Sequence, residues 1–388
     1  MYKIQTLNAI SAVGLDQFPH DLYEVASDIQ GPDALLVRSH KIHDQDVPQS
    51  VKVIGRAGAG VNNVPVAAMT QRGIPVFNTP GANANAVREI VIAGMLLASR
   101  NLCQAWDYVR HLKGSHQEIE HQVEKHKKQF AGSELLGKSL GIIGLGNVGV
   151  KVANAALHLG MQVIGFDPTI TVNRAWELSS AVKQAHTIDD LLMQSDFVSF
   201  HVPLTAETQN MINASRIALM KKGAILLNFA REGILDNDAL LDALNEQKVN
   251  AYVTDFPNSK LLSHPKVISL PHLGASTQEA EENCASLIVQ QVRAFLEQGT
   301  IIHSVNFPSI DMPRNNGSTR LAIANINVPN MVAQISSKLA TAALNIVSLL
   351  NKSREQIAYT LIDINGPISP ALLQSIATIE GVVQVRQL

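Results

Sequence analysis

The sequence predicts an α/β protein with more than one domain. At 388 residues the chain is too long for one ordinary hydrophobic core. Short β-branched runs alternate with helical patterns through most of it, which is typical of parallel sheets with crossover helices. After Val305 this alternation stops. The chain therefore divides into a large α/β part and a smaller C-terminal part.

The composition of the chain argues against nucleic-acid-binding, secreted and membrane proteins. The chain is 46% apolar and 16% charged, with a formal net charge of −2, so we expect no basic face for nucleic acid. Its two cysteines, Cys103 and Cys284, are far apart, which fits a reducing cytoplasm. The first ten residues lack a signal-peptide core, and the apolar run 90–98 is too short to span a bilayer. We expect a cytoplasmic protein without a membrane partner.

Two series of candidate strands indicate two α/β units. The helical segment 278–298 leaves the second series and could return the chain to the first. The first series comprises 34–39, 51–58 and 74–81, and the second 140–146, 162–167, 197–204, 224–230, 251–256 and 267–272.

The C-terminal part begins with a segment that predicts a linker. Residues 306–317 contain two prolines and no hydrophobic periodicity. Residues 318–388 then read strand, helix, strand, strand, helix, strand. This βαββαβ order predicts a small ferredoxin-like domain.

A glycine-rich loop predicts a dinucleotide site. Gly144, Gly146 and Gly149 are spaced G-x-G-x-x-G between an apolar strand and a helix, and the next strand ends at Asp167. The glycines would allow a tight turn, close approach of a pyrophosphate and helix–strand packing, while Asp167 would accept hydrogen bonds from ribose hydroxyls. Because a carboxylate repels a 2′-phosphate, NAD is favoured over NADP. The alternative is a glycine-rich turn beside a surface aspartate.

Two basic residues at predicted strand ends are candidates for catalysis. His272 lies in ISLPHLGAST and Arg231 in NFAREGILD, each after an apolar run. Imidazole titrates near neutral pH, and a guanidinium can bind a carboxylate through two parallel hydrogen bonds. Taken singly, each is more simply a hydrogen-bonded structural histidine or a solvated turn arginine. Together they predict a pair that handles the proton and the anion in a hydride transfer.

These motifs occur in an order that resembles a known family. The series GLGNVG, FDP, FHVPLT, NFAREGILDNDAL, TDF and PHLGAST is similar to the D-isomer-specific 2-hydroxyacid dehydrogenases over residues 1–305. The segments VRS, VIGRAGAGVNNV and GIPVFNTPGAN, with the C-terminal βαββαβ pattern, resemble the D-3-phosphoglycerate dehydrogenases that carry an ACT domain. Those enzymes oxidise 3-phospho-D-glycerate to 3-phosphooxypyruvate with NAD, the first step of L-serine biosynthesis.

The resemblance implies a domain plan. A discontinuous flavodoxin-like substrate-binding domain would comprise 1–85 and 277–305, and a Rossmann-type NAD-binding domain 86–276. The linker 306–317 would lead to an ACT regulatory domain, 318–388. A homodimer through the cofactor domains is implied, with ACT pairing allowing a homotetramer.

The resemblance also implies roles for individual residues. Arg231 matches the substrate-orienting arginine and His272 the acid/base. Cofactor positions are matched by Thr79, Gly144, Gly146, Asn147, Val148, Gly149, Asp167, Val202, Phe229, Ala230, Asp255, Gly274 and Ala275, and substrate-side positions by Arg38, Ser39, Arg56, Gly58, Ala59 and Gly60.

One departure from the family pattern concerns the histidine's partner. A glutamate normally follows the aspartate of the DVFxxEP-like segment, but this chain has Asn258, Ser259 and Lys260 there. Such a carboxylate orients a catalytic imidazole and stabilises its charged form. Glu279, Glu281 or another group would have to substitute.

Two asparagines in the small domain are candidate effector ligands. Asn327 and Asn345 match positions that bind L-serine in ACT domains, and amide side chains both donate and accept hydrogen bonds. Asn325 and Asn330 depart from the pattern around them. Turn capping is the alternative role for both candidates.

Other functions remain open at this point. The chain could be another D-2-hydroxyacid dehydrogenase, such as a hydroxypyruvate or glyoxylate reductase, or a non-catalytic NAD-sensing regulator. We expect no metal site, because the histidines 111, 116, 121 and 126 recur every five residues and do not share a helix face.

Overall fold

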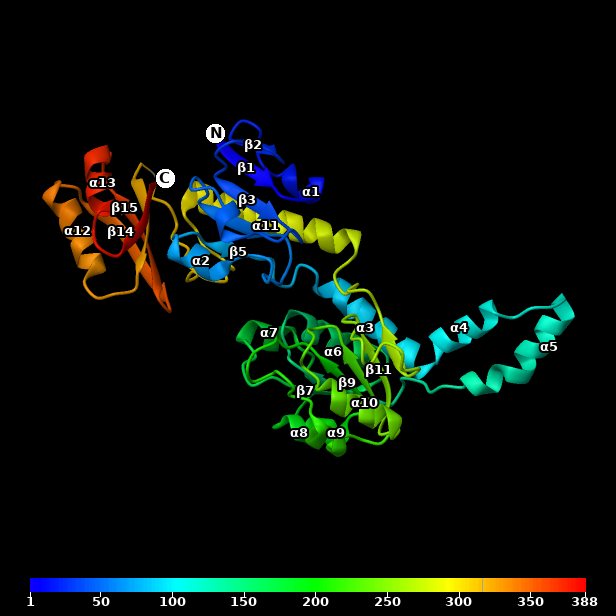
Figure 1. The fold of residues 1–388 in the computed structure, drawn as a ribbon. Helices are drawn as coiled ribbons and strands as arrows, with labels where there is room; N and C mark the ends of the chain where they lie inside the picture. The colour runs from blue at the N-terminus through cyan, green and yellow to red at the C-terminus, as the bar shows by residue number, and fades with distance from the viewer. Residues whose placement is uncertain (316) are drawn as a thin grey trace. The chain divides into compact units, whose positions relative to one another are not determined.

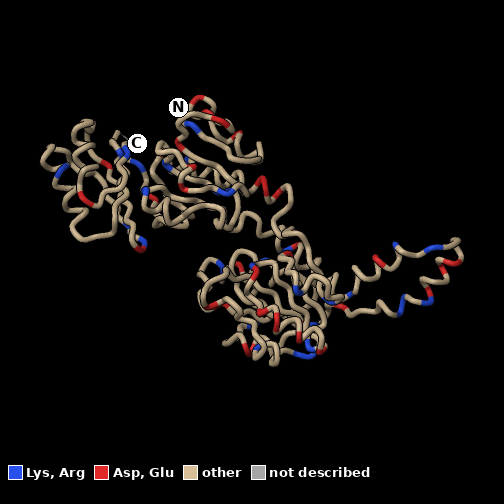
Figure 2. Tube along the Cα trace, viewed as in Figure 1, with Lys and Arg blue, Asp and Glu red and all other residues tan. Residues whose placement is uncertain are grey.

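The computed structural model describes residues 1–315 and 317–388 and divides into two compact units. Unit 1 comprises Met1–Asn83 and Gln278–Leu388, and unit 2 comprises Ala84–Thr277 (Figure 1). In the part of the chain that the structure describes, no helix is both long and apolar enough to cross a bilayer. Figure 2 shows basic and acidic residues interspersed along both units, in keeping with the net charge of −2.

Unit 1 is built on a five-stranded parallel sheet of order β2-β1-β3-β4-β5. This is the flavodoxin-like order, whose direction reverses between β1 and β3. The strands are β1 (Tyr2–Thr6), β2 (Tyr23–Ala26), β3 (Ala34–Val37), β4 (Val53–Arg56) and β5 (Val76–Phe77); the helices are α1 (Ala12–Leu15), a 3-10 turn η1 (Asp44–Asp46), α2 (Val66–Gln71) and α11 (Gln278–Gln298).

Helix α11 is the main packing element of this sheet, and its predicted range is confirmed. Ile288, Val292 and Phe295 are completely buried within one core cluster. The ring of Phe295 meets that of Phe77 on β5 edge to face, with centroids 5.9 Å apart. A Cβ at Gly55 of β4 would lie 2.8 Å from Ile288, so the close approach of helix to sheet requires glycine there.

Unit 2 contains a seven-stranded parallel sheet of order β12-β11-β10-β9-β6-β7-β8. Helices α3 and α6 cover one face, and α8, α9 and α10 the other, as in a doubly wound fold. The strands are β6 (Ser139–Ile143), β7 (Gln162–Phe166), β8 (Lys183–Gln184), β9 (Phe197–Phe200), β10 (Ala224–Asn228), β11 (Val249–Thr254) and β12 (Val267–Ser269); the helices are α3 (Ala84–Ser99), α6 (Asn147–His158), α7 (Val172–Glu177), α8 (Ile188–Gln194), α9 (Ala214–Leu219) and α10 (Asn237–Asn245).

A helical arm projects from unit 2 (Figure 1). It consists of α4 (Leu102–Arg110), α5 (His116–His126) and a 3-10 turn, η2 (Lys127–Phe130). Helix α5 begins with a capping box formed by Ser115 and Glu118. On α4, Trp106 is 62% exposed.

The C-terminal part of unit 1 has the predicted βαββαβ order, folded as an antiparallel sheet, β14-β15-β13-β16. One face packs on α12 and α13, and the other joins the core of the five-stranded sheet through Ala322, Tyr359 and Leu361. The elements are β13 (Thr319–Ile326), α12 (Met331–Thr341), β14 (Ile346–Arg354), β15 (Ile357–Ile364), α13 (Pro370–Ala377) and β16 (Val382–Gln387).

The first part of the segment predicted as a linker is packed in the core, whereas Asp311, Pro313 and Arg314 are exposed. Phe307 and Ile310 are buried in the shared core, and Ile310 forms a β-bridge with Ile301. The ring of Phe307 meets that of Tyr359 at 6.0 Å. Residue 316 of this segment lies outside the described residues.

A buried ion pair anchors the C-terminal sheet. Arg320 on β13 donates from Nε and Nη2 to the two carboxylate oxygens of Asp363 on β15, at 2.7 and 2.8 Å. The same guanidinium donates to the carbonyls of Gln298, Met312 and Pro313. Burial opposes ionisation of Asp363, but the hydrogen bonds from Arg320 hold its pKa below the usual range.

We expect Arg320→Met to lower the free energy of unfolding by about 3–5 kcal/mol, because Asp363 would remain charged and buried without its partner. Urea denaturation followed by circular dichroism measures the change. The double variant Arg320→Met/Asp363→Leu should recover much of the loss. As a control, Lys260→Met at the exposed Lys260–Asp238 pair should cost less than about 1 kcal/mol; equal losses in the two single variants would contradict the analysis.

Candidate cofactor and catalytic site

The glycine loop joins β6 to α6 at the point where the strand order of the seven-stranded sheet reverses. Gly144 has a φ of +94°, and a Cβ there would lie 2.6 Å from the carbonyl oxygen of His201. A Cβ at Gly149 would lie 2.0 Å from the carbonyl oxygen of Gly144. At Gly146, by contrast, no atom lies within 4 Å of the Cβ position. The loop is therefore tight on its inner side and open at Gly146, as a pyrophosphate site requires.

Asp167 closes this loop from the neighbouring strand, β7. Its Oδ2 accepts a hydrogen bond from Leu145 N at 2.8 Å, and its Oδ1 accepts from Thr169 N at 2.8 Å. The carboxylate is thus held beside the glycine turn, in the position that ribose recognition needs. Asn147 and Val148 begin α6 directly after the loop, where free N–H groups favour anions.

Arg231 follows β10 in a turn fixed by Asn228. The side-chain amide of Asn228 donates to the Arg231 carbonyl at 2.9 Å, and its oxygen accepts from Ala230 N at 3.2 Å. Thr254 of the adjacent strand donates to the Asn228 carbonyl at 2.9 Å. The Arg231 guanidinium is exposed at the end of the strand.

His272 follows β12, the strand beyond β11. Its backbone N–H donates to the Asp255 carbonyl at 3.1 Å, and its ring packs on Phe256 with centroids 4.9 Å apart. The residue has a φ of +43°, a left-handed conformation that is uncommon outside glycine. The surrounding contacts hold this strained backbone, which directs the imidazole to the surface.

Asp255 lies between these two basic residues in the fold and is 1% exposed. Its Oδ2 accepts from Gly274 N at 2.9 Å, but its buried Oδ1 has no hydrogen-bond partner among the described residues. Burial raises the pKa of Asp255, while the Gly274 N–H and the charges of His272 and Arg231 act in the opposite direction. Since β10, β11 and β12 are parallel neighbours, their carboxyl ends bring Arg231, Asp255 and His272 together.

The remaining cofactor candidates of unit 2 flank these groups. Val202 lies against the Gly144 turn, and Phe229 packs on Gly94 of α3. Ala230 and Ala275 are partly buried beside Arg231 and Gly274 respectively. His201 donates or accepts a hydrogen bond with Ser199 at 2.9 Å, and burial of its ring lowers its pKa to about 4, so it is a neutral strand-end residue.

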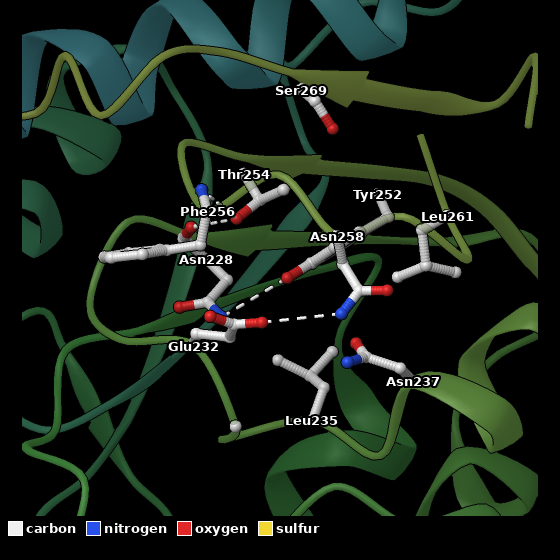
Figure 3. A pocket seen from close by; sticks show the side chains of 11 residues that line it. Asn228, Glu232, Leu235, Asn237, Tyr252, Thr254, Phe256, Asn258, Leu261 and Ser269 are labelled. Carbon is white, nitrogen blue, oxygen red and sulfur yellow. Dashed lines mark hydrogen bonds between the residues drawn. The ribbon is translucent and has the colours of Figure 1, made fainter. Parts of the chain in front are cut away.

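Asn258, one of the residues at the position of the missing glutamate, lines a small cavity of about 10 Å³ (Figure 3). Asn258 donates there to Glu232 at 3.4 Å, a long hydrogen bond drawn as a dashed line. The cavity has room for one water at most and is too small for a substrate. Glu232, a carboxylate that follows Arg231 directly, was not among the residues predicted from the sequence.

The substrate-side candidates lie together in unit 1, around the point where the five-stranded sheet reverses its order. Arg38 and Ser39 follow β3, and Arg56 ends β4. Asn8, which follows β1, accepts from Arg38 N at 2.9 Å and donates to the Ser39 hydroxyl at 3.1 Å. Arg56 Nε donates to the Arg38 carbonyl at 3.0 Å. Asn8 was not predicted as a site residue. Its place directly after a strand would have indicated it, but β1 itself was not predicted.

The turn after Arg56 is shaped by glycine. Gly58 has a φ of +150°, and a Cβ there would collide with the Arg56 guanidinium at 1.7 Å. Its carbonyl accepts from Thr79 N at 3.0 Å, and the Ala59 carbonyl accepts from Asn78 at 2.6 Å. Gly60 continues this turn, and Thr79 itself is completely buried.

Comparison with known proteins identifies the family. The chain is 31% identical to the D-3-phosphoglycerate dehydrogenase of Haemophilus influenzae, over 99% of this chain and 94% of that protein. Residues 92–274 match the NAD-binding domain of the D-isomer specific 2-hydroxyacid dehydrogenases. The chain belongs to the D-isomer-specific 2-hydroxyacid dehydrogenases.

Other members of this dehydrogenase family agree in sequence and in fold. The D-3-phosphoglycerate dehydrogenase of Methanocaldococcus jannaschii is 38% identical over 74% of this chain, which spans about half (54%) of that relative's length. An NAD⁺-bound 3-phosphoglycerate dehydrogenase from Entamoeba histolytica has a TM-score of 0.62 at 27% identity, covering 79% of this chain and 98% of that one. A glyoxylate reductase from Paecilomyes thermophila has a TM-score of 0.66 at 26% identity, with 78% and 98% covered.

We expect Asp255→Asn to stabilise the protein without cofactor at neutral pH. The raised pKa means that ionised Asp255 costs stability above that pKa, and the cost is relieved as the pH falls and the folded state takes up the proton. The variant's advantage in Tm should therefore shrink on acidification, measured by calorimetry from pH 8 to pH 4. Exposed Asp238→Asn serves as the control. A difference independent of pH would contradict the assignment.

Proposed function

We propose that this dehydrogenase oxidises 3-phospho-D-glycerate to 3-phosphooxypyruvate with NAD, the first step of L-serine biosynthesis. The observation that carries the proposal is the presentation of Arg231 and His272 by β10 and β12, the strands on either side of β11, around buried Asp255. The printed names of relatives at 31–38% identity support the phosphorylated substrate. Glyoxylate reduction remains the alternative, since a reductase of that kind shares the fold at 26% identity.

The residues of unit 2 fit a dinucleotide. Open Gly146 and the N-terminus of α6 would receive the pyrophosphate, and Asp167 the ribose hydroxyls. The unpaired, buried Oδ1 of Asp255 offers an acceptor for a carboxamide N–H, which would satisfy an oxygen that the protein leaves without a partner. When bound, NAD supplies the acceptor for the hydride from C2 of the substrate.

The chain's own residues would handle the proton and the anion. His272 Nε2 or Nδ1 would take the proton of the C2 hydroxyl, which requires the neutral ring. The Arg231 guanidinium would hold the substrate carboxylate and the carbonyl oxygen as it forms. Asp255 would favour the protonated imidazole once the proton has transferred, because their charges interact.

The two arginines of unit 1 are proposed to bind the phosphate. Arg38 and Arg56 are joined by the hydrogen bond from Arg56 Nε to the Arg38 carbonyl, so both guanidiniums belong to one structural cluster. Two guanidiniums suit a dianionic phosphate, whereas an unphosphorylated 2-hydroxy acid gives them no second anion to bind. We place the specificity for phosphate here.

His272→Ala should lower kcat about 10²–10⁴-fold with 3-phospho-D-glycerate and NAD, the usual contribution of a general base. NADH absorbance measures the rate on a panel of 2-hydroxy acids with and without phosphate. His186→Ala, an exposed histidine after β8, is the matched control and should keep full activity. Arg231→Gln should lower kcat/KM more than kcat. Retention of more than a tenth of kcat in His272→Ala would exclude its role as the base.

We also propose that the C-terminal βαββαβ domain is a regulatory ACT domain and that the enzyme is a homodimer or homotetramer. The sheet order and antiparallel register support the domain assignment. The exposed apolar residues Leu102, Trp106 and Val109 on the arm support self-association through unit 2. Asn345 is exposed, whereas the amide of Asn327 donates to the Glu355 carbonyl at 3.0 Å, which favours a capping role for Asn327.

If L-serine is the effector, calorimetric titration should show saturable heat, and NADH formation should fall with the same midpoint. Asn345→Ala should weaken both, because an amide ligand would be lost. D-serine is the control ligand. Absence of heat and of inhibition at millimolar L-serine would reject L-serine as the effector of this domain.

A further inference from the structure

Arg38 already has an anionic partner, contributed by the helix that packs on its sheet. Its Nη2 lies 2.7 Å from Oε1 of Glu281, in the first turns of α11. The Arg38 side chain is 34% exposed and that of Glu281 41% exposed, so solvent reaches both partners. An arriving anion therefore meets a guanidinium that is accessible and already paired.

This ion pair belongs to a larger cluster. Cys284, one turn further along α11, is buried, and burial raises its pKa. Arg56 Nε donates to the Arg38 carbonyl at 3.0 Å, and Arg38 pairs with Glu281, so these three residues lie together at the start of the helix. Two positive charges and one negative charge thus converge where the strands β3 and β4 end.

We infer that Glu281 sets the affinity of this site for phosphate: it occupies Arg38 as a counter-ion and must be displaced by the phosphate of the substrate. The inference rests on the proposed function, in which Arg38 binds that phosphate. Glu281 then weakens the binding of a phosphorylated substrate and leaves that of an unphosphorylated one unchanged.

The weaker binding follows from competition for one guanidinium. A phosphate carries more charge than a carboxylate and offers three oxygens to the planar donors of arginine, so it can replace Glu281. A C3 hydroxyl cannot, and a substrate without phosphate leaves the Arg38–Glu281 pair intact. Partly exposed ion pairs contribute roughly two- to fivefold to an equilibrium constant. Glu281 should raise the KM for the phosphorylated substrate by that factor.

Glu281 has a simpler alternative role as an acidic residue near a helix N-terminus. Glu279 and Glu281 both lie in the first turn of α11, where negative charge stabilises a helix. A second alternative is a positioning role, in which Glu281 orients Arg38 for the phosphate. The positioning role predicts that removing Glu281 weakens phosphate binding, whereas displacement predicts that it strengthens binding. The sign of the change therefore separates them.

The test is Glu281→Gln in the full-length enzyme, with Glu282→Gln as the matched control. Both remove one negative charge from α11, but the Glu282 carboxylate accepts a hydrogen bond from Gln278 instead. We expect the KM for 3-phospho-D-glycerate to fall two- to fivefold in Glu281→Gln, with kcat changed less than twofold. The inhibition constant of D-glycerate should stay constant, and Glu282→Gln should match the wild type.

The same substitution made in an Arg38→Ala variant tests whether Glu281 acts on KM through Arg38. In Arg38→Ala, the further change Glu281→Gln should no longer lower KM, because the guanidinium for which Glu281 competes is gone. Three results would each overturn the inference: a higher KM in Glu281→Gln, an equal fall in Glu282→Gln, or a fall that persists without Arg38.

Binding of inorganic phosphate separates this inference from the proposed reaction. A wild-type enzyme that forms no NADH from 3-phospho-D-glycerate would refute the proposed substrate. Calorimetric titration with phosphate would still report on the cluster: tighter binding by Glu281→Gln than by wild type supports displacement, and unchanged or weaker binding refutes it.

Discussion

The arrangement proposed for catalysis depends on one buried carboxylate. Asp255 is nearly inaccessible to water, yet one of its oxygens has no hydrogen-bond partner among the described residues. Two features offset the cost of burying it: the Gly274 N–H, and the charges of Arg231 and His272. The parallel register of β10, β11 and β12 supplies all of these groups from adjacent strand ends. A buried carboxylate oxygen without a hydrogen bond lowers the stability of the protein. A ligand that donates a hydrogen bond to this oxygen would remove that cost.

Features encoded by local patterns could be predicted from the sequence. The glycine spacing with Asp167 needs only one strand, one turn and one helix, and the structure places Asp167 on that turn through Leu145 N. Helix α11 has the predicted range, because its apolar residues recur with helical periodicity. The βαββαβ order could also be predicted, because each of its strands and helices has its own local pattern. Strands β1 and β2 were missed, since they are only five and four residues long and have charged residues among their apolar ones.

Features created by long-range contact could not be predicted. Nothing in the sequence pairs Arg38 with Glu281 or Arg320 with Asp363, because each contact joins segments that only the folded sheets bring together. The sequence analysis offered Glu281 as a substitute partner for His272, and the structure instead places it on Arg38. The segment 306–317 was predicted as a linker because periodicity is absent, but single apolar residues such as Phe307 and Ile310 bury its first part in the core.

Helix α11 connects the arginine cluster of unit 1 with the C-terminal sheet of the same unit. Its 21 residues extend about 30 Å. Near one end stands Glu281 beside Arg38; at the other, Phe295 packs in the shared core and the Gln298 carbonyl accepts from Arg320 of the C-terminal sheet. A helix is stiff along its axis, so axial sliding or rotation of this rod moves both ends at once. Any rearrangement of the distal sheet would thus be transmitted, without an intervening loop, to the charge balance around the arginines.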